Sequence, residues 1–216
     1  MIIATNWSEP NNLGDVNIIT VEISIFVPKY KEMKAQDKSA LIERLSIEVN
    51  RQSEIVRTQF QPLSKDRLLD TSDNKYWSII QNLEHLNLYY AYYNPAIKRS
   101  LDQARPDASA SMFTSSWLGD YFTKSMDYRN AKKVKAFKDY IPPVDLNPED
   151  VIRIFLSNQE ELVGLLDRSK EHNLTKIKTA ISLTKWITMR LGDVFQFVIM
   201  HNERHIVQAQ SRIPAK

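Results

Sequence analysis

Cysteine is absent from the 216-residue chain. Its absence excludes disulfide bonds, thiolate metal sites and a cysteine nucleophile built from the chain itself, and it fits a reducing compartment. Glycine is scarce as well, because the chain has four and they lie far apart. A loop that binds phosphate through glycines needs several of them close together, so the common nucleotide-binding motifs are excluded.

Long apolar runs and a strong net charge are also missing. Glu22 interrupts the stretch IITVEISIF, and no run approaches the roughly 18 residues that a membrane span needs. The first residues lack the basic and apolar regions of a secretory signal. A net charge of +3 gives little reason to expect a nucleic-acid partner. We therefore expect a cytoplasmic protein that binds a small molecule and neither nucleic acid nor membrane.

The chain divides near its start. Residues 1–34 combine a turn-like segment, NNLGDVN, with the β-rich IITVEISIFV, and this pattern differs from that of the remaining residues. We expect an N-terminal extension here, either a weak strand or disordered. Residues 35–216 are predicted to form one helical domain.

Four amphipathic helices are predicted from apolar residues spaced three and four apart. Asn147 and Pro148 suit the start of the third helix, Asp73 is a candidate cap for the second, and Pro95 should kink or shorten the second. A long connection separates the second and third helices. These features predict an all-α fold, a four-helix bundle. The predicted helices cover residues 37–60, 74–101, 148–169 and 184–210.

The last predicted helix carries a seam that changes from apolar to polar along its length. Its members succeed one another at intervals of 4, 3, 4, 3, 4 and 3 residues, which is the spacing of a face that packs on other helices. The seam consists of Ile187, Leu191, Val194, Val198, His201, His205 and Gln208.

Trp77 and Trp186 are expected to anchor the core near helix starts.

Two imidazoles on this seam suggest a metal site. His201 and His205 are one helical turn apart, so both rings can approach one point, and a divalent ion is a natural occupant. An incidental or hydrogen-bonded pair is the alternative. His85, in the middle of the second helix, is the obvious third ligand, whereas His172 lies in a connection that looks exposed. Three histidines would leave a coordination position open, as catalytic sites do.

The motif HNERH differs from the zinc-protease motif. In that motif glutamate directly follows the first histidine, but here Asn202 takes that place. Glu203 lies about 200° around the helix from either histidine, since each residue turns the helix by about 100°. We therefore expect Glu203 to point away from the ion, towards solvent.

Polar residues near the histidines are expected to complete a pocket. Gln208 could support a ligand, and Arg204 could pair with an anionic group of a substrate, although a structural salt bridge is the simpler alternative. The face of the second helix that carries His85 also holds polar and aromatic side chains, as a pocket lining should. Those predicted pocket residues are Ser78, Gln81, Tyr89 and Tyr92.

The segments YWSIIQNLEHLNLYY and LGDVFQFVIMHNERHIVQAQ resemble the DinB-like superfamily of metal-binding four-helix bundles, which is distinct from the DNA polymerase of similar name. WLGDYF and AFKDYIPP resemble the segment between them in bacterial members. The resemblance covers about residues 37–210 and implies a long connection between helices two and three. It also implies a divalent ion, commonly zinc or nickel, held by His85, His201 and His205, and a homodimer.

Characterised relatives include transferases that use a low-molecular-weight thiol such as mycothiol, bacillithiol or glutathione. The resemblance therefore implies that a metal-dependent thiol S-transferase is one function to test, with the thiol supplied from outside. A metal-dependent hydrolase and a non-catalytic metal-binding dimer, acting as a stress or binding module, are the alternatives. No residue is assigned a catalytic role from the sequence.

Overall fold

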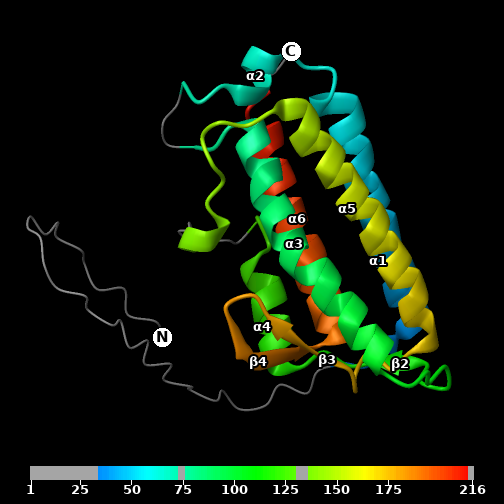
Figure 1. Cartoon of the computed structure of the whole chain (residues 1–216). Coiled ribbons are helices and arrows are strands. Elements are labelled where there is room, and N and C mark those ends of the chain that lie inside the picture. The colour runs from blue at the N-terminus through cyan, green and yellow to red at the C-terminus, as the bar shows by residue number, and fades with distance from the viewer. Residues whose placement is uncertain (1–33, 73–75, 130–135, 214–216) are drawn as a thin grey trace, which may run out of the picture. The chain divides into compact units, whose positions relative to one another are not determined.

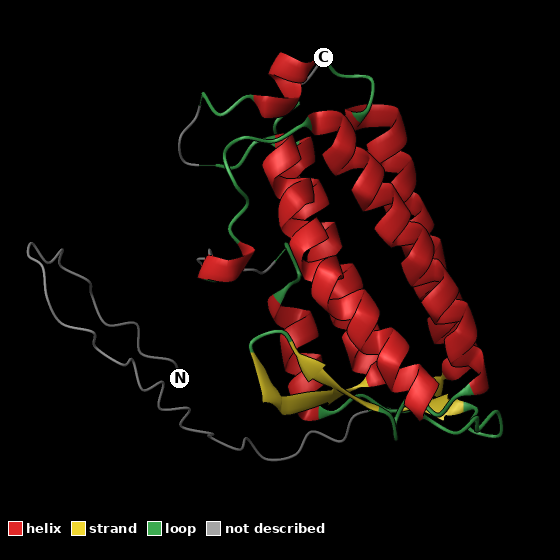
Figure 2. Ribbon diagram, viewed as in Figure 1, coloured by secondary structure: helices red, strands yellow, loops and turns green. Residues whose placement is uncertain are grey.

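The computed structural model describes residues 34–72, 76–129 and 136–213. The predicted extension, residues 1–34, lies almost entirely outside the described residues, as does the candidate cap Asp73. The described residues are mostly helical, as expected (Figure 2). None of the helices within these ranges is both long and apolar enough to cross a bilayer.

The long helices begin and end close to where the apolar spacing predicts, with one exception. α1 spans Lys38–Ile55 and continues as a π-helical turn, Val56–Phe60. α3 spans Ile79–Gln103 and α5 spans Pro148–Arg168. α6 spans Leu191–Gln210 and so begins seven residues after the predicted start at Thr184. The shorter helices are α2, Lys65–Leu69, and α4, Trp117–Ser125, with 3-10 turns at Lys138–Tyr140 and Ser169–Glu171.

Side-chain caps explain the helix starts. The Asn147 side chain accepts a hydrogen bond from the Glu149 amide, with Pro148 in the first turn, as predicted. α3 starts at a capping box in which Ser78 and Gln81 exchange hydrogen bonds with each other's backbone. Pro95 lies inside α3 without ending it, so of the two predicted effects, a kink or a shorter helix, the shortening does not occur.

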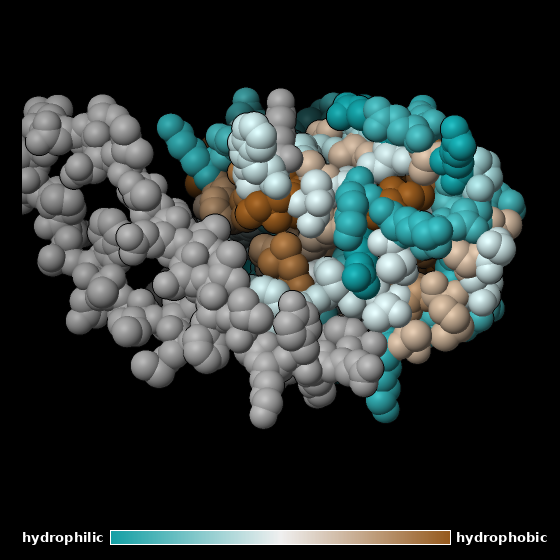
Figure 3. Space-filling view, turned by 90° about the horizontal axis from the view of Figure 1, so that it is seen from below, coloured by the Kyte–Doolittle hydropathy of each residue, from teal (hydrophilic) through white to brown (hydrophobic). Residues whose placement is uncertain are grey.

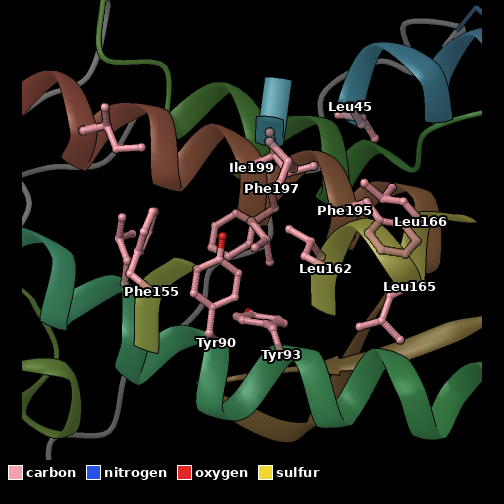
Figure 4. Close-up of a cluster of buried hydrophobic side chains, with 14 of the residues drawn as sticks. Leu45, Tyr90, Tyr93, Phe155, Leu162, Leu165, Leu166, Phe195, Phe197 and Ile199 are labelled. Carbon is pink, nitrogen blue, oxygen red and sulfur yellow. The ribbon is translucent and has the colours of Figure 1, made fainter. Parts of the chain in front are cut away.

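The four long helices lie side by side (Figure 1). α3 packs against α5 and α6, and α1 packs against the same two helices. Figure 4 shows the core that they enclose, where Tyr90 and Tyr93 of α3 meet Phe155 of α5 and Phe197 of α6. This packing fixes α3 against α6, the two helices that carry the three predicted ligands.

Two small sheets add minor strands to the mostly helical fold. β1, Gln36–Asp37, pairs with β2, Met112–Phe113, and β3, Lys178–Ile181, pairs with β4, Thr184–Arg190; both pairs are antiparallel. The second pair occupies the predicted connection and the predicted start of the last helix. Thr179, Ile181 and Met189 are buried there. Buried side chains alternate with less buried ones in the hairpin, which is typical of strands with one buried face.

Trp186 shows the consequence of this hairpin. Its side chain lies on β4 and is 94% exposed, so the prediction of a core anchor at a helix start was wrong. Ile187 also belongs to β4 and is therefore not a member of the helical seam. The strands gather at one end of the long helices (Figure 2), and small apolar patches lie among polar residues on that end (Figure 3).

α4 is attached to the first turn of α6 through a buried carboxylate. Asp193 is fully buried, and its Oδ2 atom accepts hydrogen bonds from the Ser116 amide at 2.9 Å and the Ser116 hydroxyl at 2.7 Å. Burial raises the pKa of Asp193, while these hydrogen bonds lower it. Gly119 lies against Asp193 so closely that an added Cβ would be 2.1 Å from Asp193 Cγ. The glycine is therefore required for α4 to contact α6.

A chain of buried polar side chains crosses the core directly behind the predicted ligands. Asn202 Nδ2 donates to the Tyr90 hydroxyl, which donates to Gln159 Oε1 at 2.8 Å. Gln159 Nε2 in turn lies 3.5 Å from Gln52 Oε1. The chain joins α6, α3, α5 and α1, and Asn202 directly follows His201. It therefore fixes the rotation of α6 that turns the histidines towards α3.

We predict that Tyr90→Phe lowers the free energy of unfolding by about 1–3 kcal/mol, because it leaves two buried amide groups without their partner. The measurement is urea unfolding. Tyr121→Phe is the matched control, since Tyr121 is 46% exposed on α4 and surface changes usually stay within about 0.5 kcal/mol. Equal effects of the two variants would contradict the prediction.

Candidate metal centre

Three histidines meet between α3 and α6. His85 comes from the second turn of α3, and His201 and His205 lie one turn apart on α6. All three side chains are buried, with 3%, 5% and 8% exposure. Each offers one ring nitrogen, and these nitrogens all lie within 4.8 Å of one another. The three residues form a cluster of the kind that could hold a metal ion.

Hydrogen bonds on the outer side of the cluster orient two of the rings. His85 Nδ1 lies 2.6 Å from the Tyr140 carbonyl oxygen, and His205 Nδ1 lies 3.0 Å from Asn82 Oδ1. The Asn82 amide is itself oriented, because its Nδ2 donates to the Ser78 carbonyl at 2.9 Å. Both partners of the histidines are acceptors, so both Nδ1 atoms carry the proton. In the neutral rings, Nε2 is left with a lone pair.

The inner nitrogens face one another. His85 Nε2 and His201 Nε2 are 3.3 Å apart. The ring centroid of His205 lies 4.4 Å from that of His85 and 4.7 Å from that of His201. Metal-binding histidines commonly donate their outer N–H to a carbonyl or amide oxygen and turn the other nitrogen to the ion. The cluster has this arrangement at His85 and His205.

Aromatic rings pack against the imidazoles and shield part of their surface from solvent. Trp77 stacks on His205 with ring centroids 5.8 Å apart, and it also contacts His85 at 4.8 Å. Tyr89 lies 4.4 Å from the His201 ring. Trp77 is half-buried, so its role is to cover the cluster more than to fill the centre of the core.

Burial keeps the three imidazoles neutral. It lowers the pKa of His85 to about 4, although the hydrogen bond with Tyr140 opposes this shift. Burial also lowers the pKa of His201 and of His205 well below the usual value, and the neighbouring imidazoles and Arg204 add to both shifts. A neutral imidazole is the form that binds metal. The cluster therefore presents metal-binding nitrogens at neutral pH.

The cluster opens into a cavity of about 360 Å³. Arg204 lies on its wall together with Tyr76, Phe137 and Gln208. Burial lowers the pKa of Arg204, although arginine remains charged at neutral pH. Among the described residues that line this cavity there is no aspartate or glutamate. The described part of the wall therefore holds a cationic side chain and no carboxylate that could act as a general base.

The predicted pocket residues fall into two groups. Gln208, Arg204 and Tyr89 line the cavity, and Gln208 forms a side-chain hydrogen bond with His205. Ser78 and Gln81 instead cap α3 and line an adjoining cavity of about 540 Å³. The Tyr92 hydroxyl donates to the Ile181 carbonyl at 2.9 Å and is directed to the hairpin. Ser78, Gln81 and Tyr92 are therefore not on the wall of the cavity that holds the histidines.

The structure corrects two further predictions, which concern the surroundings of Glu203 and of His172. Glu203 does point away from the cluster, but its side chain is only 16% exposed and pairs with Arg51 of α1. It therefore faces a neighbouring helix and not solvent. His172 was expected to be exposed, yet it is 7% exposed, and its carbonyl accepts a hydrogen bond from the buried Lys38 ammonium. It does not belong to the cluster of three.

Sequence reasoning missed Asn82 and Tyr140. Asn82 precedes His85 by three residues, so it lies on the same face of α3, and this spacing could have identified it. Tyr140 acts through its backbone carbonyl from the irregular segment between α4 and α5. A backbone contact has no signature in residue type, so no pattern could have predicted it.

We predict that the metal-free protein loses stability as the pH falls from about 6.5 to about 4. Over this range the unfolded state binds a proton at His85 that the folded state, with its pKa of about 4, does not. For His85 alone the loss is about 3 kcal/mol. Urea unfolding in the presence of a chelator measures it, and His85→Leu should show a shallower pH dependence. Identical slopes for the two proteins would exclude a neutral buried His85.

A comparison with known proteins places this chain in a family. A family model of the DinB superfamily matches residues 49–209, well over half of the chain and including all three clustered histidines. No curated protein and no solved structure is significantly similar to the chain. The chain therefore belongs to the DinB superfamily.

Proposed function

We propose that this protein binds one divalent transition-metal ion through His85, His201 and His205, with zinc or nickel as the preferred ions. The observation that carries the proposal is the approach of three buried, neutral imidazole nitrogens to within 4.8 Å of one another. Imidazole ligands suit both ions. The DinB superfamily is also generally metal-binding. We further propose that the four long helices form a four-helix bundle and that the protein is a homodimer, as the sequence resemblance implies.

The spacing of the nitrogens fits a metal ion after a small adjustment. Zinc binds imidazole nitrogen at about 2.0–2.1 Å, which places two nitrogens of a tetrahedral site about 3.3 Å apart. The Nε2 atoms of His85 and His201 already lie 3.3 Å apart. The widest separation in the cluster reaches 4.8 Å, so binding requires the rings to turn towards one another. Three protein ligands leave room for a further ligand from the cavity.

We infer that the reaction is transfer of a low-molecular-weight thiol to an electrophile, such as an epoxide, a halide or an unsaturated acid. When bound, the ion would lower the pKa of a thiol and favour the thiolate at neutral pH. The chain has no cysteine, so the sulfur must come from outside. Arg204 on the cavity wall supplies a cationic group for an anionic part of the thiol or the electrophile.

The cavity lining favours transfer over hydrolysis. A metal-dependent hydrolase commonly uses a carboxylate or a histidine to accept the proton of the attacking water. The described residues around the cavity include no carboxylate, and the three histidines there are the proposed ligands. Glu84, beside His85, forms a hydrogen bond with Asn87 and does not line the cavity. A thiolate nucleophile needs no such base once it is deprotonated.

We predict that the metal-loaded protein consumes thiol in the presence of electrophile and that His201→Ala abolishes this activity. Loss of an outer partner of a metal ligand already costs about 10- to 100-fold, so loss of a ligand should cost more. The measurement is thiol consumption against a panel of electrophiles with bacillithiol, mycothiol and glutathione. His172→Ala is the matched control, because His172 is buried but lies outside the cluster.

Three outcomes would contradict the proposed function. Turnover that persists in His201→Ala would show that the cluster is not the reaction site. Product that forms equally well without added thiol would favour hydrolysis. A metal content that falls in His85→Ala and His205→Ala while no thiol reaction is found would leave a metal-binding protein without the proposed transferase activity.

We also predict that Asn82→Leu weakens zinc binding about 10- to 100-fold, because the Nδ1–H group of His205 loses its acceptor. Leucine has a similar size, so the change tests the hydrogen bond more than the packing. Competition with a chelator of known affinity measures the effect. Asn87→Leu, on the same helix but bonded to Glu84 and to the Val151 carbonyl, serves as the control. Equal zinc affinities in the two variants would remove Asn82 from the site.

A further inference from the structure

A small apolar cavity adjoins the cavity that holds the histidines. Its volume is about 70 Å³, and it shares three wall residues, Tyr89, Met126 and Phe137, with the larger cavity. α3, α6 and the β3–β4 hairpin supply further walls through Tyr93, Phe197 and Leu183, in that order. We call this space the side cavity.

The walls of the side cavity are in contact with the proposed ligands. Phe197 precedes His201 by one helical turn, and the two rings are parallel with centroids 5.9 Å apart. Tyr89, which lies 4.4 Å from the His201 ring, also stacks on Tyr93 at 6.2 Å. Tyr89 therefore contacts both a proposed ligand and another wall residue of the side cavity, so the two spaces are direct neighbours.

The chemistry of the walls is apolar. None of the described residues that line the side cavity is charged. Two of its polar members partner each other, since the Tyr93 hydroxyl donates to Ser182 Oγ at 3.4 Å and accepts from the Ser182 amide at 3.2 Å. A polar or charged group placed here would lose its hydration without compensation. An alkyl group gains about fourfold in affinity for each methylene that leaves water.

The size of the side cavity limits the occupant further. A cavity of about 150 Å³ admits benzene, and the side cavity has about half that volume. A planar ring is therefore too large, and an unbranched alkyl group, which has a smaller cross-section than a branched one, fits so small a space best. We propose that the side cavity is a subsite for a short, unbranched alkyl group of the molecule that binds at the three histidines. This inference rests on the proposed function and names its substrate class.

Two methionines on the walls allow a test that does not need activity or metal. We expect 1-butanol, used as a probe with full-length protein carrying ¹³C-methyl methionine, to shift the methyl signals of Met126 and Met189, which line the side cavity. Met200 lies outside the lining and should not respond. tert-Butanol, which has the same number of carbons, should shift neither. Equal shifts with both alcohols, or none at Met126 and Met189, would overturn the inference.

The second arm tests the connection to the histidines. In the zinc-loaded protein, the affinity for ethanethiol, 1-propanethiol and 1-butanethiol should rise about fourfold per methylene until the side cavity is full. Phe122→Ala should move this limit to longer chains, while Tyr121→Ala, its exposed neighbour on α4, should not. Leu183→Trp, at a residue that is 45% exposed, should flatten the series without disturbing the core.

The two arms separate failure of this inference from failure of the proposed function. Zinc-dependent binding of all three thiols with equal affinity would overturn the subsite and leave the metal centre intact. Absence of zinc and thiol binding, with the methionine shifts present, would overturn the proposed function and leave an alkyl-binding cavity. A further outcome is that Phe122→Ala folds normally and yet leaves unchanged the chain length at which the affinity stops rising. That result would contradict the assignment of Phe122 to the wall of the side cavity.

Discussion

The confinement of three imidazoles between two packed helices is the constraint on which the site depends. His85 Nε2 lies within hydrogen-bond distance of His201 Nε2, but the inward lone pairs of three neutral buried imidazoles cannot all be paired with one another, so the arrangement needs another source of stability. Tyr140 and Asn82 bind the outer nitrogens of His85 and His205. Behind the cluster, the Tyr90–Asn202 hydrogen bond fixes the rotation of α6. Core positions therefore hold imidazole nitrogens that face inward, and a bound cation would pair with their lone pairs.

The same helices determine what can reach the cluster. α4 is fixed against α6 through Asp193 and Gly119, and Phe122 and Met126 of this segment line the side cavity next to the histidines. The β3–β4 hairpin closes the other side with Ile181 and Met189. The two elements that interrupt the simple helical architecture thus form much of the wall next to the centre. Binding specificity would then reside in these additions, whereas the metal chemistry would reside in α3 and α6.

Sequence periodicity located the helices and the pair His201 and His205, because both depend on the geometry of one helix, whereas His85 comes from a different helix. The seam through Val194, Val198, His201 and His205 needs only the 3.6-residue turn to predict that its members share a face. Ile187 and Trp186 were misplaced because three- and four-residue spacing was extended into a segment whose buried residues alternate. The burial of His172 and the ion pair of Glu203 with Arg51 depend on contacts between distant segments. Ser78 was predicted to line the pocket from its helix face, but a capping residue at a helix start is used by the backbone.

X-ray absorption spectroscopy of the zinc-loaded protein can decide whether the cluster is a metal centre, because it counts the imidazoles bound to the ion. We expect three imidazole nitrogens at about 2.0–2.1 Å, falling to two in His85→Ala and remaining three in His172→Ala. A first shell made mainly of water oxygens, or one unchanged by His85→Ala, would contradict this expectation. Either result would show that the approach of α3 and α6 does not create a metal centre.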